Sequence, residues 1–292
     1  MSTIKALAAS STAALALALS GCTTANIPGS TAPITQSEAQ MGAEAHPQLL
    51  AEFGGAMTGS QAQYVQQVGQ NIAVQSGLGN ARESFTVSML NSSVNNAFAI
   101  PGGFVYTTRQ LVTLMDNEAE LAAVLGHEVG HVAARHSQRR QANQQRNTLL
   151  GAGAAILSGI LLGNSGIGQQ IGQAALQGSQ LLTLSFSRGQ ELEADTLGIR
   201  YLTQAGYDPT AMATVLASLA AQNSLDARIQ GRDDARLPAW ASTHPDPASR
   251  VQQALATAQG TSGITNRDTF LERIDGLMYG DDPEQGIIEG RQ

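Results

Sequence analysis

The amino-acid sequence predicts an α+β fold that is mostly helical, with a small antiparallel sheet packed against a central helix. Two observations lead to this prediction. Long segments on both sides of residue 110 carry apolar side chains at intervals of three and four, the period of a helix with a buried face. Just before that point, residues 84–107 form short alternating runs that end at Pro and Gly, as strands and turns do. With 292 residues the chain can bury a sizeable core.

The N-terminus has the features of an export signal and is left out of the fold prediction. Lys5 supplies a positive charge, and Ala6–Leu19 is an apolar run too short to span a membrane. Leu-Ser-Gly and then Cys22 follow the pattern of a bacterial lipobox; the alternative is an ordinary signal peptide with an incidental cysteine. Because Cys22 is the only cysteine in the chain, we interpret residues 1–21 as a signal peptide and Cys22 as lipidated.

These features predict a protein that faces the periplasm and is anchored to a membrane by lipid. Acyl chains on Cys22 would anchor it, since each buried CH₂ contributes about 0.8 kcal/mol. Thr23 follows the cysteine in place of Asp, and by resemblance to enterobacterial sorting this predicts the outer membrane. Residues 22–45 lack a hydrophobic period and are expected to hold the lipidated cysteine and a flexible tether.

The charge balance excludes one class of partner. The formal net charge is −7, and only 13% of the residues are charged. No basic surface is expected that could neutralise phosphates, so we predict that the protein does not bind nucleic acid.

The folded part is expected to begin with a helix over residues 47–75, where apolar residues recur on one face. Residues 85–90 alternate like a strand. A second strand over residues 97–100 leads through a Pro-Gly-Gly turn into a third over residues 104–107. Together these strands predict the antiparallel sheet.

The central helix follows, and either Asp116 or Asn117 can cap it. Glu118 and Glu120 lie in its first turn, where acidic side chains favour the helix dipole. Apolar residues at helical spacing predict one face against the core, and the helix is expected to continue through Arg139.

This helix contains a His-Glu-x-x-His motif, formed by His127, Glu128 and His131. The two imidazoles are about 40° apart around the helix axis and roughly 6 Å apart along it, so they can share one tetrahedral Zn²⁺. Glu128 can reach a water on that ion and is the candidate general base. A histidine pair alone is usually a surface feature of a helix. Here two observations favour a metal site. Gly126 and Gly130 have no side chains, so little covers the helix surface near the ligands, and a candidate third ligand lies downstream.

That ligand comes from a second predicted helix, which begins near residue 188. Glu191 and Asp195 are four residues apart and share a face, whereas Glu193 should point away. A Glu191 carboxylate would complete a His₂Glu zinc site, and Asp195 could accept the free ring N–H of a ligand histidine. Without the histidine motif, an acidic solvated helix face would be the simpler interpretation.

Three further features lie outside the predicted metal site. His136 is nine residues from His127 and on the opposite side of a continuous helix, so it is predicted to be structural and not a ligand. His46 is expected to be incidental. Residues 147–187 contain no charged side chain, and a buried helical hairpin, an apolar flap beside the site and a membrane helix interrupted by glycine remain alternatives.

Three motifs together resemble a known family. They are the histidine motif, Arg-x-x-Glu-x-Glu-Ala-Asp from Arg188 to Asp195, and Ser-Thr-His-Pro around His244 with Arg250 downstream. In this order they resemble the gluzincin metallopeptidases of the CAAX prenyl protease and HtpX type, and above all the periplasmic lipoprotein branch that includes BepA and LoiP. The resemblance covers roughly residues 45 to 280.

The resemblance implies one Zn²⁺ per chain, with His127, His131 and Glu191 as its ligands. Glu128 would be the catalytic base, and Asp195 would support the ligands from outside. His244 would be a second catalytic residue that stabilises the oxyanion, or, in a latent form, would bind the zinc itself. The metallopeptidase domain is expected over residues 46–260, with residues 261–292 as a C-terminal tail.

The resemblance also implies a function. We expect a membrane-anchored zinc endopeptidase that hydrolyses misfolded or stalled envelope and outer-membrane proteins, with an extended substrate paired to a sheet edge. The barrel assembly machinery of the outer membrane is an expected partner. The alternative is a chaperone-like assembly factor whose zinc site is largely latent.

Overall fold

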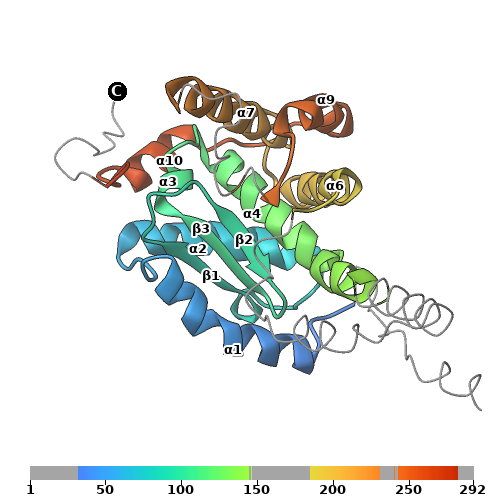
Figure 1. The fold of residues 1–292 in the computed structure, drawn as a ribbon. Helices are drawn as coiled ribbons and strands as arrows, with labels where there is room; N and C mark the ends of the chain where they lie inside the picture. The colour runs from blue at the N-terminus through green and yellow to red at the C-terminus, as the bar shows by residue number, and fades with distance from the viewer. Residues whose placement is uncertain (1–31, 145, 147–184, 231–239, 241–242, 282–292) are drawn as a thin grey trace, which may run out of the picture.

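The computed structural model describes residues 32–144, 146, 185–230, 240 and 243–281, so Cys22 and nearly all of the charge-free segment lie outside the described residues. A three-stranded sheet and the helices around it make up this part of the chain (Figure 1). None of its helices combines the length and the apolar character that crossing a bilayer requires. In chain order the elements are α1 (Gln36–Glu52), α2 (Ser60–Ala73), η1 (Val74–Ser76), η2 (Arg82–Ser84), β1 (Thr86–Leu90), β2 (Ala97–Ile100), β3 (Phe104–Thr108), α3 (Arg109–Val112), α4 (Glu118–Ala133), α6 (Arg188–Ala205), α7 (Ala211–Gln230), α9 (Pro247–Ala258) and α10 (Arg267–Ile274).

The sheet is mixed, which corrects the prediction of a purely antiparallel one. Its strand order is β1-β3-β2, with β3 antiparallel to β2 and parallel to β1. The β2–β3 hairpin turns through Gly102 and Gly103, whose φ angles of 94° and 83° favour glycine. The strand that follows β1 in the chain, β2, does not pair with β1. The third strand, β3, lies between them and pairs with both. Alternation along a strand identifies the strand but not its neighbours, which is why the prediction was wrong here.

Helix α1 covers one face of the sheet and corrects the predicted extent of the tether. Residues 36–45 form its first turns, begun by a capping box in which Thr35 and Glu38 bond each other's backbone N–H. His46 is not incidental, because its Nδ1 lies 2.7 Å from the hydroxyl of Tyr106, whose pKa is raised by burial. The apolar contact between helix and sheet consists of Leu49, Leu90, Phe98, Ile100 and Tyr106.

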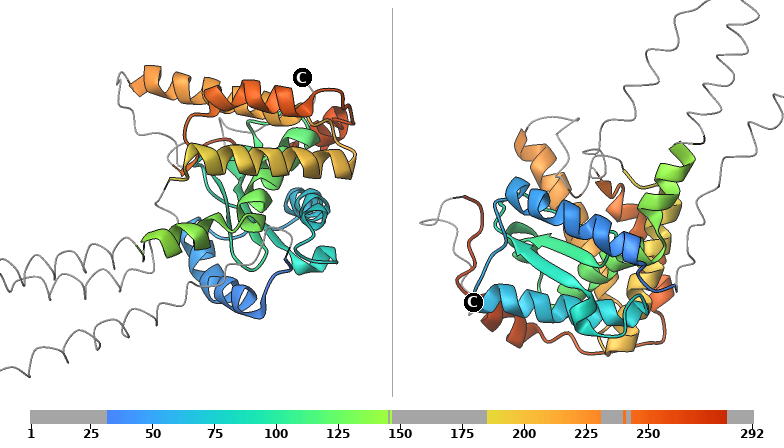
Figure 2. Two further views of the ribbon diagram at one scale, coloured as in Figure 1. Left: turned by 90° about the vertical axis from the view of Figure 1, so that its right-hand side faces the viewer. Right: turned by 90° about the horizontal axis from the view of Figure 1, so that it is seen from below.

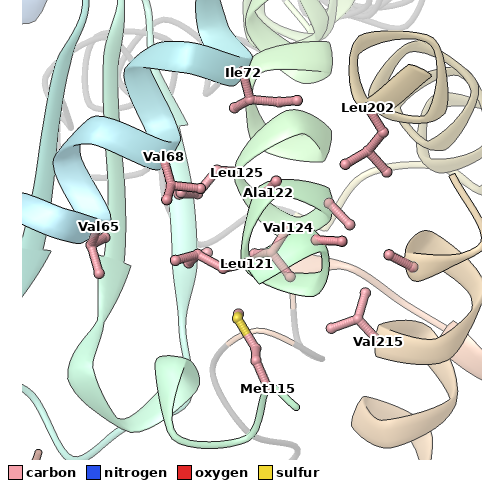
Figure 3. Packing of buried hydrophobic residues seen from close by; sticks show 14 of the residues in the cluster. Val65, Val68, Ile72, Met115, Leu121, Ala122, Val124, Leu125, Leu202 and Val215 are labelled. Carbon is pink, nitrogen blue, oxygen red and sulfur yellow. The ribbon is translucent and has the colours of Figure 1, made fainter. Parts of the chain in front are cut away.

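Helix α4 lies at the centre of the molecule. Figure 2 shows its two layers of neighbours, with the sheet and α1 on one side and α6, α7 and α9 on the other. Leu121 and Leu125 face Val68 of α2, while Val124 faces Val215 of α7 (Figure 3). All of its residues except Val132 are buried, so the helix is enclosed on every side and not only on the one face expected.

The N-terminal end of α4 is anchored as predicted and is also joined to the C-terminal segment. Asn117 caps the helix by accepting a hydrogen bond from the Glu120 backbone N–H. The buried carboxylate of Glu118 accepts hydrogen bonds from the hydroxyls of Tyr64 and Tyr207 and from the side-chain amide of Asn266. Helix α10 buries Phe270 and Ile274 against this region, so residues 267–274 pack on the domain and do not extend from it as part of a tail.

The C-terminal end of α4 differs from the prediction. The helix ends at Ala133, and Arg135 takes a left-handed backbone conformation with a φ of 51°. Helical structure resumes at residue 136 in a new direction, so the predicted continuous helix through Arg139 is wrong. The residue types do not predict this break. Left-handed backbone conformations are uncommon outside glycine and asparagine, and neither residue occurs at this position.

Candidate metal centre

Helices α4 and α6 cross closely, and small residues make this possible. A Cβ atom added to Gly130 would lie 2.9 Å from the carbonyl oxygen of Ala194, and one added to Gly198 would lie 3.1 Å from the backbone nitrogen of His127. Neither contact leaves room for a methyl group. The first turn of α6 is therefore held directly beside the histidines of α4, and it carries Glu191.

Four buried side chains converge on one point: His127, His131, Glu191 and His244. One donor atom from each lies within 4.8 Å of all the others, so the group could hold one metal ion. The Nε2 atoms of the two α4 histidines are 3.0 Å apart. Glu191 places Oε1 at 3.4 Å from His131 Nε2 and Oε2 at 3.6 Å from His127 Nε2. Two imidazoles and a carboxylate are a donor set that catalytic zinc sites use.

Asp195 and Arg250 support this group from outside. Asp195 Oδ1 lies 2.8 Å from His127 Nδ1, so it can accept the ring N–H while Nε2 faces the centre. Arg250 is fully buried and donates from Nε to Asp195 Oδ2 at 2.8 Å and from Nη1 to Glu191 Oε2 at 2.5 Å. Arg250 is part of the third motif, but no role was predicted for it. Its guanidinium holds the carboxylates of Glu191 and Asp195 in place.

Glu128 lies beside the donor group and lines a cavity. Its side chain is buried, and Oε1 has no hydrogen-bond partner among the described residues. Phe98, Ala99 and Ile100 of strand β2 line the cavity, as does Phe186. An unsatisfied carboxylate oxygen at a cavity is available to accept a proton from a molecule bound there.

His244 touches both the donor group and Glu128. Its Nδ1 lies 3.3 Å from His127 Nε2 and 3.2 Å from Glu191 Oε1, whereas its Nε2 lies 3.4 Å from Glu128 Oε1. Burial alone would lower the pKa of His244, but the carboxylates of Glu128 and Glu191 outweigh it and raise the pKa. Trp240 stacks on the ring, with centroids 4.9 Å apart. Both roles predicted for His244 are compatible with this position.

Three residues at the site had no predicted role there: Phe186, Trp240 and His136. Phe186 stacks on the His131 ring with centroids 3.9 Å apart. His136 does not join the donor group, as predicted, but its Nδ1 lies 2.8 Å from His131 Nδ1. The predicted position of His136 on the far side of a continuous helix is wrong because the backbone turns at Arg135.

Comparison with known proteins assigns this arrangement to a family. Residues 59–258 match the sequence pattern of peptidase family M48. The chain belongs to peptidase family M48. This membership confirms the resemblance seen in the motifs and the prediction of a zinc-dependent metallopeptidase, and the buried donor group fits the one metal ion expected.

Several proteins with names that describe proteases are similar to the chain. It is 37% identical over 196 residues to the beta-barrel assembly-enhancing protease of Escherichia coli K12, covering 66% of this chain and 38% of that protein. It is 30% identical over 220 residues to the mitochondrial metalloendopeptidase OMA1 of Schizosaccharomyces pombe, covering 74% of this chain and 59% of the relative. The metalloprotease LoiP of E. coli K12 is 32% identical over 158 residues, which are 54% of this chain and 56% of LoiP. The chain thus spans well under half the length of the beta-barrel assembly-enhancing proteases.

The charges at the site fit the divalent ion that M48 enzymes require. Before any charge on the histidines is counted, one positive charge on Arg250 and three negative charges on Glu128, Glu191 and Asp195 sum to 1 − 3 = −2. An unbalanced buried charge lowers the stability of the folded protein. A divalent cation would neutralise the net charge of −2 at this site. Burial also holds the pKa of His131 well below its usual value, which keeps the ring in the neutral form that binds metal.

Proposed function

We propose that the protein is a zinc endopeptidase of the bacterial envelope, facing the periplasm and tethered to the outer membrane through lipid on Cys22. Its substrates are misfolded or stalled envelope proteins, including outer-membrane β-barrels. One observation carries the enzymatic part: donor atoms from α4 and α6 converge beside Glu128 at a cavity lined by a sheet edge. The substrate class rests on similarity to proteases named for β-barrel assembly.

In this proposal His127, His131 and Glu191 bind the metal ion, and Asp195 fixes the ring of His127. When bound, zinc lowers the pKa of a water molecule to about 7 and polarises the scissile carbonyl. Glu128 would take the proton of the attacking water at Oε1, which has no hydrogen-bond partner among the described residues, and then deliver it to the leaving amine.

The edge of the sheet suits an extended substrate. Among the described residues β2 pairs with β3 alone, so its other edge has no strand partner there, and Phe98, Ala99 and Ile100 of β2 line the cavity that Glu128 also lines. A substrate strand added there would be held by main-chain hydrogen bonds, which require no particular side chains. This mode of binding favours unfolded proteins over folded ones.

The test compares wild-type protein with Glu128→Gln for bound zinc and for cleavage of casein. We expect about one zinc per chain in both proteins and cleavage only by the wild type, because the amide keeps the shape of the side chain but cannot accept the proton. Circular dichroism checks that the variant is folded. Wild-type protein without zinc, or a zinc-loaded variant that still cleaves, would overturn the assignment.

A second candidate is an assembly factor whose zinc site is largely latent. It is favoured by His244, whose Nδ1 lies in the donor group and could complete a four-ligand set. Such a protein would bind envelope proteins at the β2 edge, act together with the barrel assembly machinery, and cleave rarely. Full complementation of a deletion strain by Glu128→Gln would support this candidate, whereas failed complementation supports the peptidase.

A further inference from the structure

The two α4 histidines that face the metal centre have different partners on their outer nitrogens. His127 Nδ1 contacts the carboxylate of Asp195, which Arg250 neutralises. His131 Nδ1 contacts a third histidine, because His136 Nδ1 lies 2.8 Å away. His136 is itself fully buried, and its Nε2 lies 3.1 Å from Glu193 Oε2 on α6. A chain of hydrogen bonds therefore runs from His131 to Glu193.

Only one arrangement of protons satisfies this chain. His131 turns Nε2 toward the donor group, so its proton is on Nδ1 and is donated outward. His136 must accept at Nδ1 and therefore carries its own proton on Nε2. That proton is donated to Glu193, whose side chain is 44% exposed and contacts Arg139 at 3.7 Å. The tautomer of His131 thus depends on a residue at the surface.

The backbone is shaped to bring His136 to this place. In a continuous α-helix, residues 131 and 136 would point about 140° apart around the axis and could not meet. The left-handed conformation of Arg135 breaks the helix between them. The buried Arg135 side chain donates to the carbonyl oxygens of Ala133 and Ala32 at 3.1 and 2.8 Å, which holds the turn. Such a conformation in a non-glycine residue persists only where the surroundings enforce it, and it often marks a functional site.

We propose that His136, supported by Glu193, is a positioning residue that fixes the tautomer and the orientation of His131 for the metal ion. This inference rests on the proposed function, because it assumes that His131 is a metal ligand. His136 would thus support His131 as Asp195 and Arg250 support His127. The difference is that the outer acceptor is an imidazole nitrogen of His136 and not a carboxylate. Outer partners of this kind orient metal-bound histidines and raise their basicity.

The test measures zinc affinity by competition with a chelator, independently of any cleavage. His136→Leu fills a similar volume but removes the acceptor, and we expect zinc binding to weaken about 10- to 100-fold. His136→Asn keeps an acceptor oxygen near the position of Nδ1 and should stay close to wild type. The visible spectrum of the Co²⁺-loaded proteins gives a second measurement, since it changes when a ligand ring is reoriented. His46→Leu is the matched control, because it removes a histidine bonded to Tyr106 away from the site.

Glu193→Ala tests the outer end of the chain at a half-exposed position where folding is not threatened, and it should weaken zinc binding less than His136→Leu does. Arg139→Ala removes only the ion pair to Glu193 at 3.7 Å and leaves the hydrogen-bond chain intact, so it should change zinc binding little. Equal zinc affinity of wild type and His136→Leu would overturn the inference, as would equal weakening by Leu and Asn. If His136→Leu does not fold, an unchanged affinity in Glu193→Ala would overturn it instead. Wild-type protein that binds no zinc would overturn the proposed function and this inference together.

Discussion

At the scale of single residues, the site is organised by buried imidazoles whose two nitrogens face different groups. His127 and His131 each direct Nε2 toward the donor group and Nδ1 toward an outer partner. His244 is reversed, with Nδ1 in the donor group and Nε2 beside Glu128 and the cavity. If His244 donates a hydrogen bond to a substrate oxyanion, it does so from Nε2–H. If His244 binds the metal ion in a latent form of the enzyme, it does so through Nδ1.

Substituting His244 by Ala separates these roles. We expect the rate of casein cleavage to fall about 100-fold with zinc content unchanged, since loss of one oxyanion donor has an effect of that size. The measurement is kcat for casein cleavage, with zinc determined on the same samples. A rise in kcat would contradict the donor role and show that the histidine restrains the enzyme.

At the scale of elements, the metal centre depends on how closely α4 and α6 approach. Gly130 faces the backbone of Ala194, so the helices meet without intervening side chains. The same contact fixes the distance between the histidines of α4 and Glu191 of α6. A change at the crossing should therefore alter stability and metal binding together.

Gly130→Ala tests this coupling. The added Cβ would lie 2.9 Å from the Ala194 carbonyl oxygen, so the helices must separate. We expect the free energy of unfolding to fall by about 1–3 kcal/mol, as for other overpacked interiors, and zinc binding to weaken. Urea denaturation with and without zinc measures both effects. Gly189→Ala is the control on α6, because nothing lies within 4 Å of its added Cβ and Ala favours the helix. Equal stability of the Gly130 variant and the wild type would contradict a tight crossing.

At the scale of the whole molecule, the metal centre joins segments that are far apart in the chain. His127 and His244 are 117 residues apart and meet at the centre, and Arg250 bonds Asp195 across 55 residues. The opposite end of α4 is joined by Glu118 to three other parts of the chain. All four members of the donor group lie in the described part of the chain, whereas the predicted anchor at Cys22 precedes that part.

Anchoring and catalysis should therefore be separable. We expect Cys22→Ser to abolish palmitate labelling and release the protein from membranes, while cleavage of casein per mole of enzyme stays unchanged. Labelling, fractionation and the casein assay measure these results on one preparation. Labelling that persists in the variant would contradict the lipobox interpretation, and lost cleavage would show that the anchor contributes to the site.

The sequence alone predicted whatever depends on helix geometry over a few residues. His127 and His131 share a face because they are four residues apart, as do Glu191 and Asp195, and the Asn117 cap is a local hydrogen bond. The absence of a side chain at Gly130 was expected to leave the helix surface open near the ligands. In the structure α6 packs closely against α4 at this position. Motif order added His244, which no local rule would have joined to the site.

Only the tertiary structure decided features that depend on where the backbone turns and on what packs against it. These features include the parallel pairing of β1 with β3, the packing of residues 36–45 as part of α1, and the contact between His136 and His131. The last arises because long-range hydrogen bonds and burial hold Arg135 in a conformation that its residue type disfavours. Local periodicity carries no information about such contacts, since their free energy comes from residues that are distant in sequence.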